Sequence, residues 1–198
     1  MEIFDMHTHN LNAPAGRAII NVPHCVITGE STFTPQTDKL YSAGIHPWYL
    51  ADETNTSIEK LEKLLTHPQI TALGECGLDK IKGGTTLDKQ IEIFKQQIIL
   101  SEKYKKPLII HCVHAFNELI QLYSQTNPIQ TWIIHGFRGK PELASQLCSV
   151  GIHLSFGIHF NPISVYRCPE SQIHIETDNS NSTIEEVYQT VSAIRTTL

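Results

Sequence analysis

The sequence has no long hydrophobic run: nothing in its 198 residues approaches the roughly 18 consecutive apolar residues of a membrane-spanning helix. Nor does it open with a basic region followed by an apolar one, and an aspartate already stands at position 5. With 40% hydrophobic and 18% charged residues, the composition is typical of a globular protein. We therefore expect a cytoplasmic protein that does not bind membranes.

Paired cysteines and an excess of positive charge are also missing. The five cysteines are odd in number, widely spaced and without a C-x-x-C motif, which argues against a disulfide framework and a structural zinc knuckle. The net charge is −5 and the pI is near 6.1, whereas proteins that neutralise nucleic-acid phosphates usually carry a basic surface. We expect free thiols at Cys25, Cys76, Cys112, Cys148 and Cys168.

Short apolar segments, often rich in β-branched residues, recur along the chain and predict eight strands. These are Ile3–Met6, Ala18–Val22, Tyr41–Ile45, Ile70–Leu73, Leu108–Ile110, Thr131–Ile134, Ile152–Phe156 and Ile173–Ile175. Amphipathic periodicity between the later strands predicts five helices. These are Ser57–Leu65, Leu87–Tyr104, Phe116–Gln125, Pro141–Ser149 and Ile184–Arg195.

Alternation of strands and helices predicts parallel strands with right-handed crossovers, and eight strands favour an α/β fold of the TIM-type (β/α)₈ barrel. The segments between residues 6 and 41 are too short, or too rich in Pro, Gly and Thr, for full helices. A typical barrel also has about 250 residues. We therefore expect a trimmed or distorted barrel with reduced helices in its first third, and a single domain over residues 1–198.

The stretch Asp5-Met6-His7-Thr8-His9 places polar side chains at every second position after the first apolar residues. In a strand, residues two apart point to the same side, which in a barrel is the interior. Buried imidazoles are costly unless something satisfies them, and a divalent cation does so. An H-x-H motif alone is more often a pair of hydrogen-bonded histidines, so the other strands must decide.

Four later strands also end in a residue that can bind metal, and barrel active sites lie at that rim. Together with the two histidines of the first strand, they supply nitrogen and oxygen donors that suit zinc, manganese, iron or cobalt better than calcium. Six ligands are too many for one tetrahedral site but fit two ions that share a carboxylate. The six are His7, His9, Glu75, His111, His135 and Asp178.

Taken in order, these strand ends resemble the TatD family of metal-dependent deoxyribonucleases, in the amidohydrolase-like superfamily of barrels. The motifs that carry the resemblance are DMHTH, GIHPW, GECGLD, PLIIHC, IIHGF, GIHLSFG and ETD. The resemblance runs from Asp5 to Asp178 and implies two divalent ions, zinc, magnesium or manganese. It also implies that His7, His9 and Asp178 bind one ion, that His111 and His135 bind the second, and that Glu75 bridges them. Asp178 would accept a proton from the attacking water, so Glu75 and Asp178 are the expected catalytic residues.

Departures from the family pattern concern substrate binding. The family usually has an arginine two positions after its fourth-strand histidine, whereas His111 is followed by Cys112 and Val113. Arg138, after His135, is the cation that we expect to compensate. The chain also ends without the final helical segment that the family carries, which adds to the expected trimming.

Other residues near the strand ends carry two interpretations each; for Asp5 the second is a direct metal ligand, and for Asp79 it is a contact with substrate. His46 is expected either to contact substrate or to make a structural hydrogen bond, and Trp48 either to stack with a base or to plug the barrel rim. Asp5 is expected to orient the metal-binding histidines, and Asp79 to shape a loop. The remaining histidines are interpreted as surface or core residues: His24, His67, His114, His153, His159 and His174.

The sequence therefore predicts an enzyme, a metal-dependent hydrolase that cleaves phosphodiester bonds in short or single-stranded DNA or in a small phosphodiester, with no obligate protein partner. An alternative keeps the metals but changes the substrate to a small ester, lactone or amide, since a fold does not fix its chemistry. A second alternative is a non-catalytic, metal-binding descendant of an enzyme.

Overall fold

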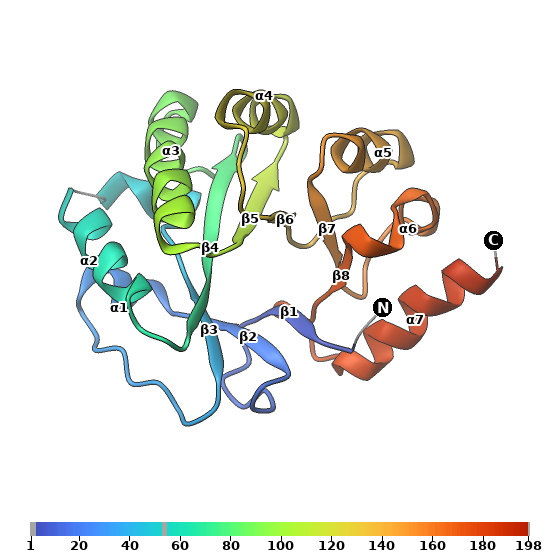
Figure 1. Cartoon of the computed structure of the whole chain (residues 1–198), viewed down its shortest axis with the longest axis horizontal. Helices are drawn as coiled ribbons and strands as arrows, with labels where there is room; N and C mark the ends of the chain where they lie inside the picture. The colour runs from blue at the N-terminus through green and yellow to red at the C-terminus, as the bar shows by residue number, and fades with distance from the viewer. Residues whose placement is uncertain (1–2, 53–54, 198) are drawn as a thin grey trace.

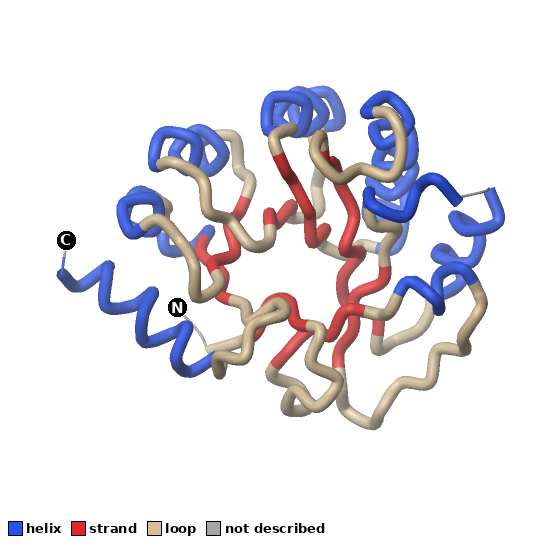
Figure 2. Tube along the Cα trace, turned by 180° about the vertical axis from the view of Figure 1, so that it is seen from behind, coloured by secondary structure: helices blue, strands red, loops and turns tan. Residues whose placement is uncertain are grey.

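The computed structural model describes residues 3–52 and 55–197 and contains a closed barrel of eight parallel strands, in chain order from β1 to β8. Figure 2 shows the strands as a ring with the helices outside it. The strands are β1 (Asp5–Thr8), β2 (Ala18–Asn21), β3 (Leu40–Ala43), β4 (Ile70–Asp79), β5 (Leu108–Val113), β6 (Trp132–Ile134), β7 (His153–Phe156) and β8 (Ile173–Ile175). The TIM-type barrel fold and all eight expected strands are thus confirmed.

The helices follow the predicted pattern but include short elements that periodicity missed (Figure 1). The longer helices are α2 (Asn55–Leu65), α3 (Leu87–Tyr104), α4 (Phe116–Thr126), α5 (Pro141–Ser149) and α7 (Ile184–Thr197). The short ones are α1 (His24–Thr28), α6 (Pro162–Arg167) and the 3₁₀ helices η1 (Pro47–Asp52) and η2 (Glu170–Gln172). Only the five-residue α1 separates β2 from β3, so the expected reduction of the first third is confirmed.

Three strands extend beyond their predicted ends in ways that matter for function. The prediction ended the first strand at Met6, but β1 continues through His7 to Thr8. The prediction ended the fourth strand at Leu73, but β4 runs on to Asp79, with a register shift against β5 between Leu73 and Cys76. The prediction ended the fifth strand at Ile110, but β5 runs on to Val113 and includes His111. The sequence did not predict these extensions, because they consist largely of polar residues and glycines and so do not continue the apolar runs.

Most of the core lies between the barrel and its helices. Trp132 of β6 is fully buried and meets the rings of Phe94 in α3 and Tyr123 in α4, with centroids 5.4 and 5.1 Å away. A second, smaller cluster contains Ile19 and Ile109. These two side chains lie two residues before Asn21 and His111, so they form the floor beneath the polar rim.

No helix in the described part of the chain combines the length and the apolar composition needed to cross a bilayer.

Candidate metal centre

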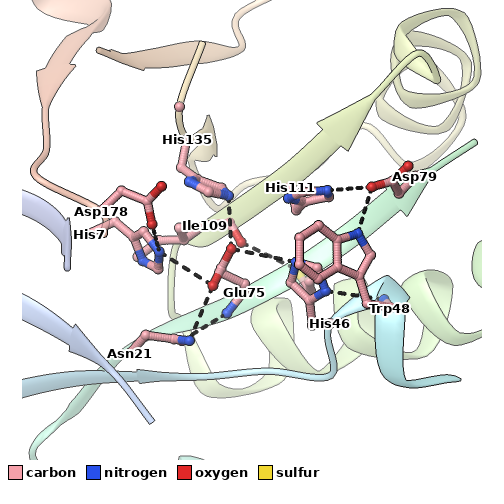
Figure 3. Close-up of polar contacts among 12 residues, drawn as sticks. His7, Asn21, His46, Trp48, Glu75, Asp79, Ile109, His111, His135 and Asp178 are labelled. Carbon is pink, nitrogen blue, oxygen red and sulfur yellow. Dashed lines mark hydrogen bonds and ion pairs between the residues drawn. The ribbon is translucent and has the colours of Figure 1, made fainter. Parts of the chain in front are cut away.

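The residues predicted to bind metal meet at the end of the barrel toward which the carboxyl ends of the strands point, and Figure 3 labels all of them except His9. Parallel strands bring these ends to one rim, so residues far apart in the chain become neighbours there. The six are His7 in β1, His9 just after it, Glu75 in β4, His111 in β5, His135 after β6 and Asp178 after β8.

The carboxylate of Glu75 stands at the centre of this cluster. Its Oε2 atom lies 3.1 Å from Nε2 of His9 and 3.4 Å from Nε2 of His7. Its Oε1 atom lies 2.9 Å from Nε2 of His135 and 3.6 Å from Nε2 of His46. The two oxygens face different histidines, which is the arrangement that a carboxylate shared by two cations needs.

Buried donors without partners make this cluster fit a divalent cation. His7 is fully buried, and neither ring nitrogen has a hydrogen-bond partner among the described residues. Nε2 of His135 is close to Glu75 but lacks hydrogen-bond geometry. Each unsatisfied buried group costs about 1–3 kcal/mol, which a bound cation would offset. Three sets of donor atoms lie within 4.8 Å of one another: His7–His9–Glu75, His7–His135–Asp178 and His46–Glu75–His111.

The charges in the cluster support one another. Burial opposes the charge of Glu75, but the facing His135 and His7 hold its pKa well below its ordinary value. A hydrogen bond to Glu75 raises the pKa of His9. Burial opposes the charge of His135 as well, but Glu75 and Glu176 raise its pKa well above the ordinary value. Protons and cations therefore compete for the same ring nitrogens, and cation binding releases protons.

Asp5 does not orient the histidines of β1, contrary to the prediction. The pairing of β1 with β2 shifts register between Asp5 and Thr8, which interrupts the alternation of side chains. Asp5 instead accepts hydrogen bonds from the backbone N–H and the hydroxyl of Thr177, at 3.0 and 2.6 Å. Burial raises the pKa of Asp5 to about 6. Asp5 thus holds the residue that precedes Asp178.

The backbone of Asp178 is bound to β1 on both sides. Its N–H donates to the carbonyl of His7 at 2.9 Å, and its carbonyl accepts from the N–H of His9 at 3.1 Å. Asp178 has a φ of 50°, a left-handed conformation that aspartate and asparagine tolerate best among non-glycine residues. Its Oδ1 atom lies 3.7 and 3.8 Å from Nε2 of His9 and His7.

Asp79 orients His111, a role that the sequence reasoning missed. Oδ1 accepts from the backbone N–H groups of Ile81 and Lys82, as expected for a loop-shaping residue. Oδ2 lies 2.7 Å from the indole nitrogen of Trp48 and 2.9 Å from Nε2 of His111. Burial opposes the charge of Asp79, but these hydrogen bonds hold its pKa below the ordinary value. Because a carboxylate can only accept, Nε2 of His111 carries the hydrogen and Nδ1 keeps its lone pair.

Replacing Asp79 with asparagine should weaken metal binding about 10–100-fold, because an amide accepts hydrogen bonds at only one of its two end atoms. Competition with a chromogenic chelator measures the affinity. Trp48→Phe is the matched control: it removes the indole donor but leaves the bond between Asp79 and His111, so metal affinity should stay close to that of the parent. Equal affinities in Asp79→Asn and the parent would show that His111 needs no orienting carboxylate.

Glu176 and Asn21 also hold the cluster in place, and the sequence reasoning named neither. Oε1 of Glu176 accepts from the backbone N–H of Gly136 at 2.7 Å and lies 3.4 Å from Nδ1 of His135. The amide nitrogen of Asn21 donates to Oε2 of Glu75, and its oxygen accepts from the backbone N–H of Glu75, both at 3.2 Å. Metal-binding histidines and carboxylates usually need such partners.

Gly44, directly after β3, lets the backbone of β4 come close. A Cβ atom at Gly44 would lie 2.6 Å from the carbonyl oxygen of Glu75 and 2.7 Å from Cα of Gly74. Gly44→Ala should therefore displace Glu75, lower the free energy of unfolding by about 1–3 kcal/mol and reduce bound metal.

Urea unfolding and elemental analysis measure both effects of Gly44→Ala. Gly157→Ala, directly after β7, is the matched control because its Cβ would meet nothing closer than 3.6 Å. If Gly44→Ala matched this control in stability and metal content, close backbone approach would not position Glu75.

His46 presents a hydrogen rather than a lone pair to the cluster. The backbone N–H of Trp48 donates to Nδ1 of His46 at 3.1 Å, so the neutral ring carries its hydrogen on Nε2. Burial lowers the pKa of His46 to about 3, which keeps the ring neutral. Although His46 lies within 4.8 Å of Glu75 and His111, this tautomer suits a hydrogen bond to a substrate oxygen better than metal binding.

A cavity of about 510 Å³ opens over the cluster. Its lining includes five of the six predicted ligands, together with His46 and Asn21, and among the described residues it contains no lysine or arginine. Arg138 is exposed and lines a neighbouring cavity of about 250 Å³, which it shares with Asp178. Arg138 therefore stands beside the cluster rather than within the larger cavity.

A closed barrel of eight parallel strands, with histidines and carboxylates at the carboxyl ends of the strands, places the chain in the TIM-barrel class. Within this class, the family model described as TatD related DNase matches residues 31–193. The match covers most of the chain, which therefore belongs to the TatD family.

Known relatives share part of their length with this chain. A protein described as an uncharacterized metal-dependent hydrolase of Buchnera aphidicola subsp. Baizongia pistaciae is 31% identical over 148 residues, 71% of this chain and 56% of the relative. The 3'-5' ssDNA/RNA exonuclease TatD of Erwinia tasmaniensis is 31% identical over 108 residues, 54% of this chain and 42% of the relative. The chain spans about half the length of these two relatives.

The crystal structure of YjjV, a TatD homologue from Escherichia coli K12, has the same fold. It aligns with a TM-score of 0.79 over 97% of this chain and 90% of the other, at 18% sequence identity. At this identity the likeness concerns the fold alone.

Proposed function

We propose that the chain is a metal-dependent nuclease that hydrolyses phosphodiester bonds in short or single-stranded DNA. The observation that carries the proposal is the position of Glu75, whose two carboxylate oxygens face two different groups of histidines. Membership of the TatD family supports a hydrolase of this kind.

Two divalent ions, zinc, magnesium or manganese, would share Glu75. His7, His9 and Asp178 would hold one ion, in line with the short distances among their side-chain atoms. His111 and His135 would hold the other. Such ions lower the pKa of bound water and neutralise charge on phosphoryl oxygens. Since one chain supplies all six candidate ligands, we propose that the protein has no obligate protein partner.

The remaining steps belong to side chains around the cluster. Asp178 would accept the proton of the attacking water, because its carboxylate is at the cavity wall and about a third exposed. His46 would donate its Nε2 hydrogen to a phosphoryl oxygen. Arg138 would hold a neighbouring phosphate from the side of Asp178. Together these groups would place one phosphodiester between a proton acceptor, Asp178, and two hydrogen-bond donors, His46 and Arg138.

A single-stranded or short substrate fits the charge of the molecule better than duplex DNA. The net charge is −5, and within the described part of the chain no lysine or arginine lines the cavity over the metal centre. Duplex binding depends on many phosphate contacts, whereas single strands also gain from base stacking. The exonuclease from Erwinia tasmaniensis, whose name specifies single-stranded DNA and RNA, agrees with this choice.

We further propose that residues 1–198 form one domain and that the protein works in the cytoplasm. The single closed barrel and the large core cluster that its strands share with the helices support the first proposal. The five free cysteines, four of them buried, support the second, since free thiols suit a reducing compartment.

Elemental analysis of the purified protein and an assay on matched single-stranded and duplex DNA test this function. We expect up to two divalent ions per chain, and release of nucleotides from the single strand that stops with a chelator and returns with metal. Bound metal without cleavage of either DNA would contradict the proposed nuclease.

A small carboxylic ester or lactone is the second candidate substrate. The absence of lysine and arginine from the cavity lining favours it, because a neutral substrate needs no phosphate-binding cation. Turnover of p-nitrophenyl acetate beside bis(p-nitrophenyl) phosphate separates the two candidates. Metal-dependent turnover of only the acetate would replace the nuclease with an esterase, and turnover of neither would favour a non-catalytic descendant.

A further inference from the structure

Two exposed aromatic residues of η1 lie at the mouth of the cavity over the metal centre. Trp48 and Tyr49 are 39% and 43% exposed, and both line the cavity over the metal centre. Leu11, also exposed, lines the same cavity. Large apolar side chains are thus exposed beside the cluster rather than scattered singly, which points to a ligand with an apolar face.

Trp48 is a fixed wall of this mouth. Its indole N–H donates to Asp79, and the ammonium group of Lys82 lies over the ring, 5.0 Å from its centroid. The ring also meets His46 and His111 at steep angles of 76° and 77°. Because Lys82 occupies one face of the indole and two imidazoles contact the ring, the structure favours the prediction of a plug for Trp48 over that of a base-stacking platform.

Tyr49 is built differently and is the better platform. Its ring stacks on His24 with a centroid distance of 4.2 Å and an angle of 20°, so the imidazole supports the phenol from one side. The Tyr49 ring is 5.8 Å from that of His46, whose Nε2 faces Glu75. Only the His46 ring therefore separates Tyr49 from Glu75, beside which the phosphate of a substrate would bind. The sequence analysis interpreted His24 as a surface or core residue, but it lines the cavity.

The η1 segment is hydrogen-bonded to the loops that follow β3 and β4, which limits the movement of the platform. The backbone N–H of Tyr49 donates to the carbonyl of His46 at 3.1 Å, and the N–H of Gly84 donates to the carbonyl of Pro47 at 2.9 Å. A ring that is already fixed loses little conformational entropy when a ligand stacks on it.

Stacking of bases on an aromatic ring would also contribute affinity for a nucleic-acid substrate. Among the described residues, no lysine or arginine lines the cavity, so side chains within it neutralise little phosphate charge. Stacking of one base on an aromatic side chain contributes about 1–3 kcal/mol and does not depend on base identity. An aromatic platform beside the metal centre can therefore supply affinity that basic residues supply elsewhere.

We propose that Tyr49, supported by His24, is a stacking platform for the base of the nucleotide whose phosphate is held at the metal centre. This inference rests on the proposed nuclease function. It adds a subsite that binds any base and does not discriminate among the four.

Binding of two oligomers to the metal-loaded protein tests the platform. One is a short single-stranded phosphorothioate DNA, which resists cleavage, and the other is the same backbone with abasic residues throughout. Fluorescence anisotropy measures each affinity, and turnover of the ordinary phosphodiester forms is measured in parallel. The variants are Tyr49→Ala, Tyr49→Phe and, as a matched control, Tyr166→Ala, which removes a comparably exposed tyrosine from α6.

We expect the parent to bind the base-bearing oligomer about tenfold more tightly than the abasic one. Tyr49→Ala should abolish this preference, whereas Tyr49→Phe and Tyr166→Ala should keep it. Metal content and thermal unfolding temperature should be unchanged in all three variants.

Two results would overturn the platform: equal weakening of both oligomers by Tyr49→Ala, or loss of the preference in Tyr166→Ala as well. Failure of the nuclease function is distinguishable. A base preference that needs Tyr49, without hydrolysis of any oligomer, would leave the platform and remove the nuclease. Hydrolysis of the oligomers with equal weakening of both by Tyr49→Ala would leave the nuclease and remove the platform.

Discussion

Replacing Glu75 with glutamine should lower kcat by at least about a thousandfold and remove most of the bound metal. Two ions that stabilise the charge of the transition state lower the activation free energy by several kcal/mol, and each 1.36 kcal/mol changes the rate tenfold. Glutamine is neutral, and its NH₂ group would face His7 and His9 or His135, which the two carboxylate oxygens now face. Elemental analysis and nuclease turnover measure the two effects.

His7→Ala sharpens this test because it separates the two ions. If Glu75 is shared, Glu75→Gln should weaken both ions, whereas His7→Ala should release about one ion per chain before the other. Glu142→Gln makes the same chemical change at an exposed position in the first turn of α5 and should change neither quantity. Full metal content in Glu75→Gln would contradict a bridging carboxylate.

The helices and strands that could be predicted from the sequence were those whose apolar residues recur at regular spacing. The predicted bounds of α3 and α5 agree with the structure, because each helix has a clear start: Thr86 caps α3, and Pro141 opens α5. The strands were recognisable as apolar runs between turns. The six-residue α6 was missed because it is too short to show a period, although Asn161 and Pro162 mark its start.

The candidate ligands could be found because each is a polar residue near the end of an apolar strand. The same criterion applies to Asn21 at the end of β2, Asp79 at the end of β4 and Glu176 just after β8. Asn21 and Glu176 were passed over, and Asp79 was interpreted as a loop-shaping residue, because their chemistry alone does not show which side chain each one contacts. Their roles depend on which side chain each one meets across the barrel, and that follows from strand order and register.

Asp5 shows where periodicity misleads. The two-residue alternation of a strand predicted one face for Asp5 and the histidines that follow it. The register shift in β1 changes this, so Asp5 meets Thr177 instead. A bulge adds a residue without an apolar or turn signal, so a single sequence contains nothing that announces it.

Asp178→Asn should lower kcat by about 10²–10⁴ while the protein keeps its fold, because it removes the group proposed to accept the proton. Asparagine has the same shape and tolerates the left-handed backbone of this position, so the bonds of its backbone to His7 and His9 should persist. Its side-chain oxygen can still bind a cation, but without the charge, so some weakening of the first ion accompanies the loss of kcat.

Asp38→Asn is the matched control for Asp178→Asn, since Asp38 also has a left-handed backbone, with a φ of 58°, and lies exposed in the loop before β3. It should leave kcat, KM and bound metal unchanged. Single-turnover cleavage at saturating metal isolates the chemical step, because it compensates for weaker ion binding. If Asp178→Asn recovered the parent rate at high metal concentration, Asp178 would serve only as a ligand, and another group would have to accept the proton.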